Sequence, residues 1–113
     1  MSPAEALLKA ADLISKPGAW TRHEMARDKD GHDVSPWDSR AVCWCALGAI
    51  DRVTRKAAAI RTETKVALMD ALPREHEYSG VNFDKITQYN DVYSSGALDV
   101  AAVMRLAAEA IEN

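Results

Sequence analysis

The stretch from Ala41 to Val53 constrains the fold of this chain more than any other segment. It is built almost entirely of small or apolar residues, with two cysteines, a tryptophan and Gly48 among them. On a helix, one continuous face would carry Val42, Cys45, Ala46, Ala49, Ile50 and Val53. Gly48 costs a helix about 1 kcal/mol relative to alanine, and close approach by another helix would offset that cost. The segment therefore predicts a central, tightly packed helix.

Length and composition predict a single globular domain spanning residues 1–113. The chain is 48% hydrophobic and 27% charged, as in ordinary folded proteins. Aromatic residues are few, at three Trp, three Tyr and one Phe, and alanine is abundant. Small side chains of this kind favour a core made by closely approaching helices.

Helix signals dominate the rest of the chain. Ser2, Pro3 and Glu5 form a capping box with proline at the first helical position. Leu7, Ala10, Ala11 and Ile14 then recur at helical spacing until Pro17 and Gly18 end the helix. Residues 19–35 are more polar and centre on an Asp-Gly turn, which predicts a short hairpin or an ordered loop.

Four further helices are expected downstream. The second begins at Ser35-Pro36 and runs to about Lys56, the third spans 61–72, and a short one covers about 82–90. The last begins after Gly96 and carries a stripe made of Ala102, Val103, Leu106 and Ala110. The predicted fold is mainly α: a compact bundle of about five helices with one small β-hairpin or ordered loop after helix 1.

The two cysteines do not have metal-site spacing. Cys43 and Cys45 lie about 200° apart on a helix, so their sulfurs would point to opposite sides and form neither a disulfide nor a shared metal site. The three histidines lie outside any zinc spacing, and the loop from Asp28 to Asp33 matches a calcium loop only in part. We therefore expect no metal and no cofactor.

A catalytic cysteine is the alternative hypothesis for the same segment. Cys45 or Cys43 would act as the nucleophile of a hydrolase or transferase, with His32, or else His23 or His76, as the base and Asn90 or Asp91 orienting it. Both thiols, however, would lie about two turns inside the predicted helix, where the helix dipole no longer lowers a thiol pKa. Burial in the core is the favoured interpretation, and Asn90-Asp91 is favoured as a helix-end cap.

Two motifs resemble a family of short, uncharacterised bacterial and phage proteins. They are the run Trp44-Cys45-Ala46-Leu47-Gly48-Ala49 and the segment Tyr89-Asn90-Asp91 before the last helix. This chain differs from the family pattern in having Tyr89 where Trp or Phe is usual, and Gly18-Ala19-Trp20 at its first turn. The family has no assigned activity, so the resemblance implies a fold rather than a reaction.

Charge and composition favour a cytoplasmic protein that binds another protein. The net charge of −3 disfavours nucleic acid, no segment suits a membrane, and no signal peptide is recognisable. Candidate contact residues are aromatic or basic: Trp20, Trp37, Tyr93, Arg52 and Arg55. We predict a non-catalytic protein-binding module with an unidentified protein partner; a homodimer is compatible with it. The phage resemblance suggests an inhibitor of a host defence complex, similar to an anti-CRISPR protein.

Overall fold

The computed structural model describes residues 1–112 and confirms the predicted fold class. Within these residues, five α-helices accompany one two-stranded antiparallel sheet. The helices are α1 (Pro3–Ser15), α2 (Ala46–Val53), α3 (Arg61–Asp70), α4 (Asp84–Gln88) and α5 (Ala97–Glu112). The strands are β1 (Ala26–Arg27) and β2 (Cys43–Trp44). A 3-10 turn, η1 (Ala58–Ile60), precedes α3, and a π-helical turn, η2 (Tyr89–Tyr93), follows α4.

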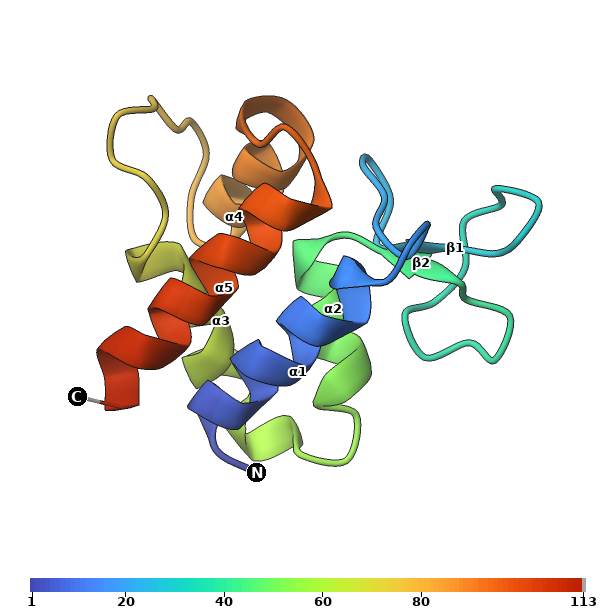
Figure 1. Cartoon of the computed structure of the whole chain (residues 1–113), viewed down its shortest axis with the longest axis horizontal. Coiled ribbons are helices and arrows are strands. Elements are labelled where there is room, and N and C mark those ends of the chain that lie inside the picture. Colours follow the sequence, from blue (N-terminus) through green and yellow to red (C-terminus); the bar gives the residue numbers. More distant parts are fainter. Residues whose placement is uncertain (113) are drawn as a thin grey trace.

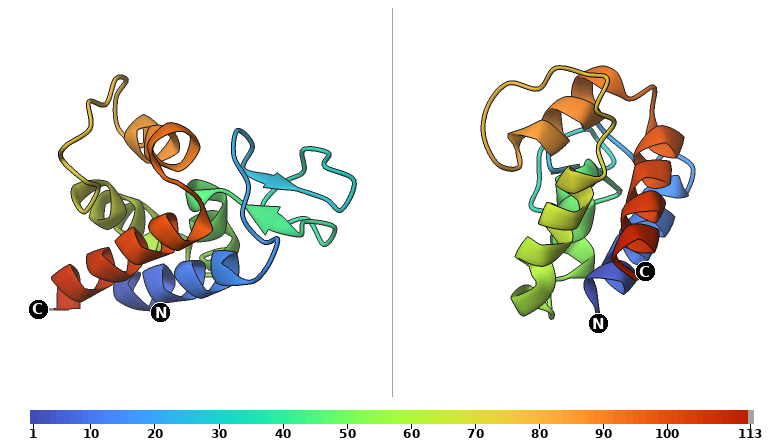
Figure 2. Two further views of the ribbon diagram at one scale, coloured as in Figure 1. Left: turned by 45° about the horizontal axis from the view of Figure 1, so that its top comes forward. Right: turned by 90° about the vertical axis from the view of Figure 1, so that its left-hand side faces the viewer.

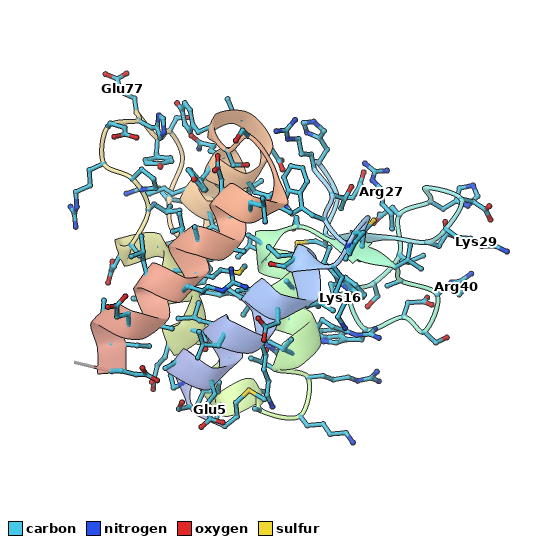
Figure 3. The ribbon with its side chains drawn as sticks, viewed as in Figure 1. Glu5, Lys16, Arg27, Lys29, Arg40 and Glu77 are labelled. Atoms are coloured by element: carbon cyan, nitrogen blue, oxygen red, sulfur yellow. The ribbon has the colours of Figure 1, made fainter. Side chains whose placement is uncertain are left out.

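The helices form two layers around a core rich in alanine. Helices α1 and α5 lie side by side in one layer, with α2 and α3 behind them (Figures 1 and 2). The sheet extends from one side of the bundle, and α4 lies at the end of the bundle where the loop after α3 arches outward (Figure 1). Charged side chains such as Lys29, Arg40 and Glu77 project outward from the loops (Figure 3). No helix within residues 1–112 is long and apolar enough to cross a membrane.

Helix α1 forms where the sequence predicts it. The Ser2 hydroxyl accepts a hydrogen bond from the Glu5 backbone N–H at 3.1 Å, and Pro3 occupies the first helical position. Its buried face consists of Ala4, Ala6, Leu7, Ala10, Ala11 and Ile14. The four alanines on this face let neighbouring helices approach closely.

Helix α5 also forms as predicted, but it turns a different face to the core. Its buried residues are Val100, Ala101, Val103, Met104, Ala107 and Ala108. Ala102, Leu106 and Ala110 of the predicted stripe are exposed. The helix is apolar on both faces, so periodicity alone could not identify the packed one.

The sheet pairs segments that are distant in sequence. Ala26 pairs with Trp44 and Arg27 with Cys43, while the turn from Asp28 to His32 forms a loop held by backbone hydrogen bonds. The expected Asp-Gly turn is therefore present. A local bridge joins Arg27 to Asp33, but the main partner of β1 lies downstream in the predicted second helix.

The prediction of a helix from Ser35 to Lys56 is wrong over its first half. The polar side chains of this segment capture nearby backbone instead: the Ser35 hydroxyl accepts from the Trp37 N–H, and the Asp38 carboxylate accepts from the Arg40 N–H at 2.8 Å. Residues 43–44 join the sheet, so the helix begins only at Ala46. Val42, placed on the buried helix face by the sequence pattern, is 48% exposed.

Candidate functional site at the start of helix α2

Cys45 caps the N-terminus of α2. Its extended backbone precedes Ala46, and its Sγ accepts a hydrogen bond from the Gly48 N–H at 3.3 Å. The expectation that Cys45 lies two turns inside a helix is therefore wrong, because the helix starts about ten residues later than the Ser35-Pro36 signal indicates. The helix dipole now acts directly on this thiol.

Asn90 connects the start of α2 to two other segments. The Asn90 side chain is fully buried, and its Oδ1 accepts from the Ala46 N–H at 3.0 Å and from the Trp20 indole N–H at 2.8 Å. Its Nδ2 donates to the Thr21 carbonyl at 3.1 Å and to Asp91 Oδ1 at 2.8 Å. Both of its side-chain polar atoms are thus fully used in joining parts of the fold.

Gly48 is required by a close backbone contact. The Met25 carbonyl lies directly against it, so that a Cβ on residue 48 would sit 1.9 Å from the Met25 oxygen. The same carbonyl accepts from the Cys45 N–H at 3.2 Å. The sequence indicated a close approach at Gly48, but the approaching backbone belongs to the loop before β1 and not to another helix.

A small cavity of about 130 Å³ opens beside Cys45. Its lining residues are His23, Glu24, Met25, Cys45, Thr87 and Asp91. His23, which has a left-handed backbone (φ 71°), places its Nδ1 3.7 Å from Asp91 Oδ2, and its backbone N–H donates to Asp91 Oδ1. A thiol, an imidazole and a carboxylate therefore line one cavity, and two of the residues named as alternatives in the sequence, His23 and Asp91, are among them.

The contacts around this cavity favour a structural joint over a reactive centre. In this joint, Cys45, Gly48 and Asn90 connect the start of α2 to neighbouring segments. Burial raises the pKa of the Cys45 thiol, and the hydrogen bond from the Gly48 N–H offsets this only in part. Within residues 1–112, Cys45 forms no hydrogen bond with a histidine; its side-chain contact is with the Met25 sulfur at 3.8 Å. The Ala46 and Gly48 N–H groups are already bonded to Asn90 and Cys45, so neither is free to hold a developing oxyanion.

His32 makes its contacts in the loop after β1 and does not line the Cys45 cavity. Its Nδ1 faces Asp28 Oδ2 at 3.3 Å in the loop after β1. Asp28, Asp30 and His32 have ligand atoms within 4.8 Å of one another. Asp28 Oδ1, however, already accepts from the Asp30 and His32 backbone N–H groups, which explains the cluster as a hydrogen-bonded turn. Those bonds also lower the pKa of Asp28.

Most of the predicted contact residues make internal interactions. Arg52 donates to the carbonyls of Pro36 and Asp38 and lies over the Trp44 ring. Arg55 donates to the Trp37 carbonyl at 3.4 Å. Arg52 in α2 and Arg55 in the turn after it thus hold the loop before β2 in place.

The three aromatic candidates are also anchored. The Trp20 indole donates to Asn90, and the Trp37 indole donates to the Asp51 carbonyl at 2.6 Å while 36% of the residue remains exposed. Tyr93 donates to the Glu77 carbonyl and stacks on His76 with ring centroids 4.2 Å apart. The five residues predicted to contact a partner thus also hold parts of the fold together, and their role in partner binding stays a prediction.

The fold and this hydrogen-bonded joint define a small, mainly helical protein. The chain belongs to a family of unknown function, DUF6197, whose model matches residues 1–110. No curated protein and no solved structure matches it. The resemblance drawn from the two short motifs is thus confirmed as membership of a family of unknown function.

Proposed function

We propose that this chain is a non-catalytic protein-binding module that contacts its partner through the exposed face of α5. One observation carries the proposal: α5 keeps large apolar side chains in solvent along one stripe. Leu98 is 75% exposed and Leu106 is 59% exposed, with the exposed Ala102 between them. Spacing of four residues places all three on one side of the helix.

This stripe differs from ordinary scattered surface leucines. Single exposed apolar residues are normal on proteins, whereas apolar residues that lie together on one face are typical of interaction surfaces. The opposite face of α5 is already packed, so the stripe is a second apolar face on the same helix. We expect the partner to supply an amphipathic helix, because an apolar stripe on an exposed helix suits packing of side chains from a second helix.

A more specific form of the proposal is an inhibitor of a host defence complex, similar to an anti-CRISPR protein. It is supported by the small size, the net charge of −3 and the lack of an assembled catalytic group within residues 1–112. A partner with a basic rim around an apolar helix would complement this chain.

The test compares a stripe variant with a matched control. Leu98→Glu combined with Leu106→Glu places two charges on the stripe, whereas Val81→Glu places one on a loop residue that is 70% exposed. Each protein is used to capture partners from host lysate, and its own association state is measured by light scattering. Thermal melts confirm that all three proteins fold.

A protein retained by the wild type and by V81E, but lost by the L98E/L106E variant, would support the proposal. Loss of a wild-type homodimer in the same variant would identify a second copy as the partner. Equal capture by all three proteins, or no capture and a monomer throughout, would overturn it.

A cysteine-dependent hydrolase or transferase is the second candidate, favoured by one observation. Cys45 lies at a helix N-terminus in a cavity shared with His23 and Asp91. The exposed His23 ring faces Asp91 and not the thiol, so it would have to reorient towards Cys45 to act as a base. Reactivity of the native thiol separates this candidate from the binding module.

A further inference from the structure

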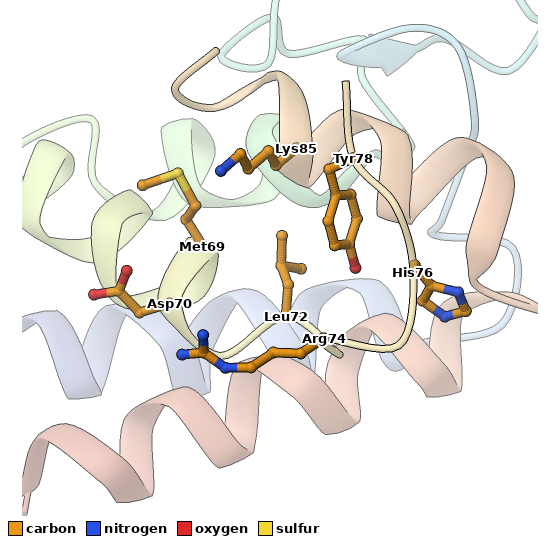
Figure 4. A pocket seen from close by; sticks show the side chains of 7 residues that line it. All are labelled: Met69, Asp70, Leu72, Arg74, His76, Tyr78 and Lys85. Carbon is orange, nitrogen blue, oxygen red and sulfur yellow. The ribbon is translucent and has the colours of Figure 1, made fainter. Parts of the chain in front are cut away.

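A separate cavity of about 280 Å³ lies where α3 ends and the chain crosses to α4. Its lining residues are Met69, Asp70, Leu72, Arg74, His76, Tyr78 and Lys85 (Figure 4). They come from the last turn of α3, from the loop spanning residues 71–83 and from α4. No residue of the α5 stripe or of the Cys45 joint lines it.

The loop over this cavity is held in one shape by aromatic residues. The Tyr78 hydroxyl donates to the Pro73 carbonyl at 2.9 Å, and the Tyr93 hydroxyl donates to the Glu77 carbonyl. His76 stacks on Tyr93 and meets the Tyr78 ring edge-on, with centroids 6.3 Å apart. Long connections that lack helix or strand and yet hold a defined shape are commonly functional.

The charges of the cavity leave two cations without a partner. Within residues 1–112, Lys85 and Arg74 take part in no ion pair and no side-chain hydrogen bond, in contrast to Lys65, which pairs with Asp51 at 2.9 Å. Lys85 is half-buried and Arg74 is exposed. Asp70 is the one carboxylate in the lining, which leaves the lining with a surplus of one positive charge.

The remaining lining combines Tyr78, Leu72 and Met69 with the polar side chains of His76 and Asp70. In Figure 4 the Leu72 side chain lies at the centre of the lining residues, with the Tyr78 ring on one side of it, the Met69 side chain on the other and Lys85 above. The volume falls just below the range of about 300–1,000 Å³ that is typical of small-molecule sites. A single substituted ring fits this size better than a nucleotide or a peptide.

We propose that this cavity binds a small aromatic anion, a ring that carries a carboxylate or a phosphate. Lys85 and Arg74, which lie on opposite sides of Leu72 (Figure 4), supply the positive charge that attracts the anionic group, and Tyr78, Leu72 and Met69 contact the ring. Arg74 offers paired N–H donors that match either oxyanion, and Lys85 adds a compact charge. This site is independent of the proposed partner surface, so either can fail without the other.

The experiment is an NMR titration of the whole ¹⁵N-labelled chain with three probes. Phenyl phosphate and benzoate carry the two anions on the same ring, and benzamide is their neutral counterpart. Wild type is compared with Lys85→Gln, Arg74→Gln and the control Lys56→Gln, an exposed lysine remote in sequence from the cavity. Thermal melts of each variant report whether the fold is retained.

We expect at least one anion to shift the amide signals of residues 69–85 in the wild type and in K56Q. Affinity should fall about tenfold in K85Q and in R74Q, and added salt should weaken binding in the wild type. Whichever of the two anions binds more tightly identifies the ligand class as a phosphate or a carboxylate. Equal affinity in all four proteins, equal binding of benzamide, or no shift with any probe would overturn the proposal.

Discussion

Replacing Gly48 by alanine should destabilise this protein, although the same change stabilises most helices. Alanine in a helix interior is favoured over glycine by about 1 kcal/mol. At Gly48 the added Cβ would lie 1.9 Å from the Met25 carbonyl oxygen and 2.8 Å from its carbon. Both are backbone atoms, so no side-chain rotation can relieve the overlap.

The loss of stability in Gly48→Ala can be worked out from the displacement of the Met25 backbone. Shifting the Met25 backbone breaks its hydrogen bond with the Cys45 N–H and displaces the loop that leads into β1. Overpacking costs about 1–3 kcal/mol, and loss of a buried backbone hydrogen bond adds about 1–2 kcal/mol. After the gain in propensity is subtracted, we expect Gly48→Ala to lower the free energy of unfolding by about 1–4 kcal/mol.

Urea denaturation followed by far-UV circular dichroism measures this difference. Ala102→Gly is the control, because that exposed α5 position should show the propensity term alone, a loss of about 1 kcal/mol. A G48A protein as stable as the wild type, or more stable, would refute the close packing of Met25 on α2.

Three further predictions test the network around this joint. Asn90→Ala leaves the Ala46 and Trp20 N–H groups without an acceptor and should cost about 3 kcal/mol in urea denaturation, whereas the exposed Thr87→Ala should stay within about 0.5 kcal/mol of the wild type. Ser2→Ala removes the α1 cap and should cost about 1 kcal/mol; an unchanged unfolding midpoint would contradict that cap. The Arg40 guanidinium lowers the pKa of Asp38 from 3.8 to about 2, so the ionised carboxylate stabilises the fold above the unfolded pKa. The Tm difference between wild type and Asp38→Asn should therefore be complete above about pH 4 and vanish as the pH falls towards 2; a difference independent of pH would contradict the pairing.

Local signals in the sequence predict most of the helices. The Ser2 cap, the proline after it and the apolar spacing up to Ile14 are all properties of neighbouring residues, and α1 follows them. The start of α5 after Gly96 is found for the same reason. Where local propensity and tertiary contacts favour the same structure, the sequence alone is sufficient to predict the helix.

The start of α2 could not be predicted from local sequence signals. Ser35 and Pro36 form a good helix start, but the pairing of Cys43 with Arg27 takes the intervening residues into a loop and a strand. That pairing is long-range and leaves no periodic signal in so short a strand. Because the helix was expected to start too early, Cys45 was placed in a helix interior, and neither its capping role nor its cavity was predicted.

The candidate sites show the same limit. Asn90 was favoured as a helix-end cap, and it does bond a helix terminus, but that terminus belongs to α2, far away in sequence. Arg52 and Arg55 were expected to contact a partner, which stays a prediction, and both donate hydrogen bonds to the loop before β2. The cavity that Lys85 lines is formed by residues from α3, from the loop after it and from α4. The sequence of no single one of these segments predicts such a cavity.

Native thiol reactivity tests most directly the claim that the start of α2 is a structural joint and not a catalytic centre. Cys43→Ser leaves Cys45 as the single thiol, and its labelling by iodoacetamide is followed by mass spectrometry across pH 6–9 with and without urea. Because Cys45 is 7% exposed and burial raises its thiol pKa, we expect labelling to be negligible in the native protein and rapid in urea. Rapid native labelling that persists below pH 7 would contradict the structural role and establish Cys45 as a reactive thiolate.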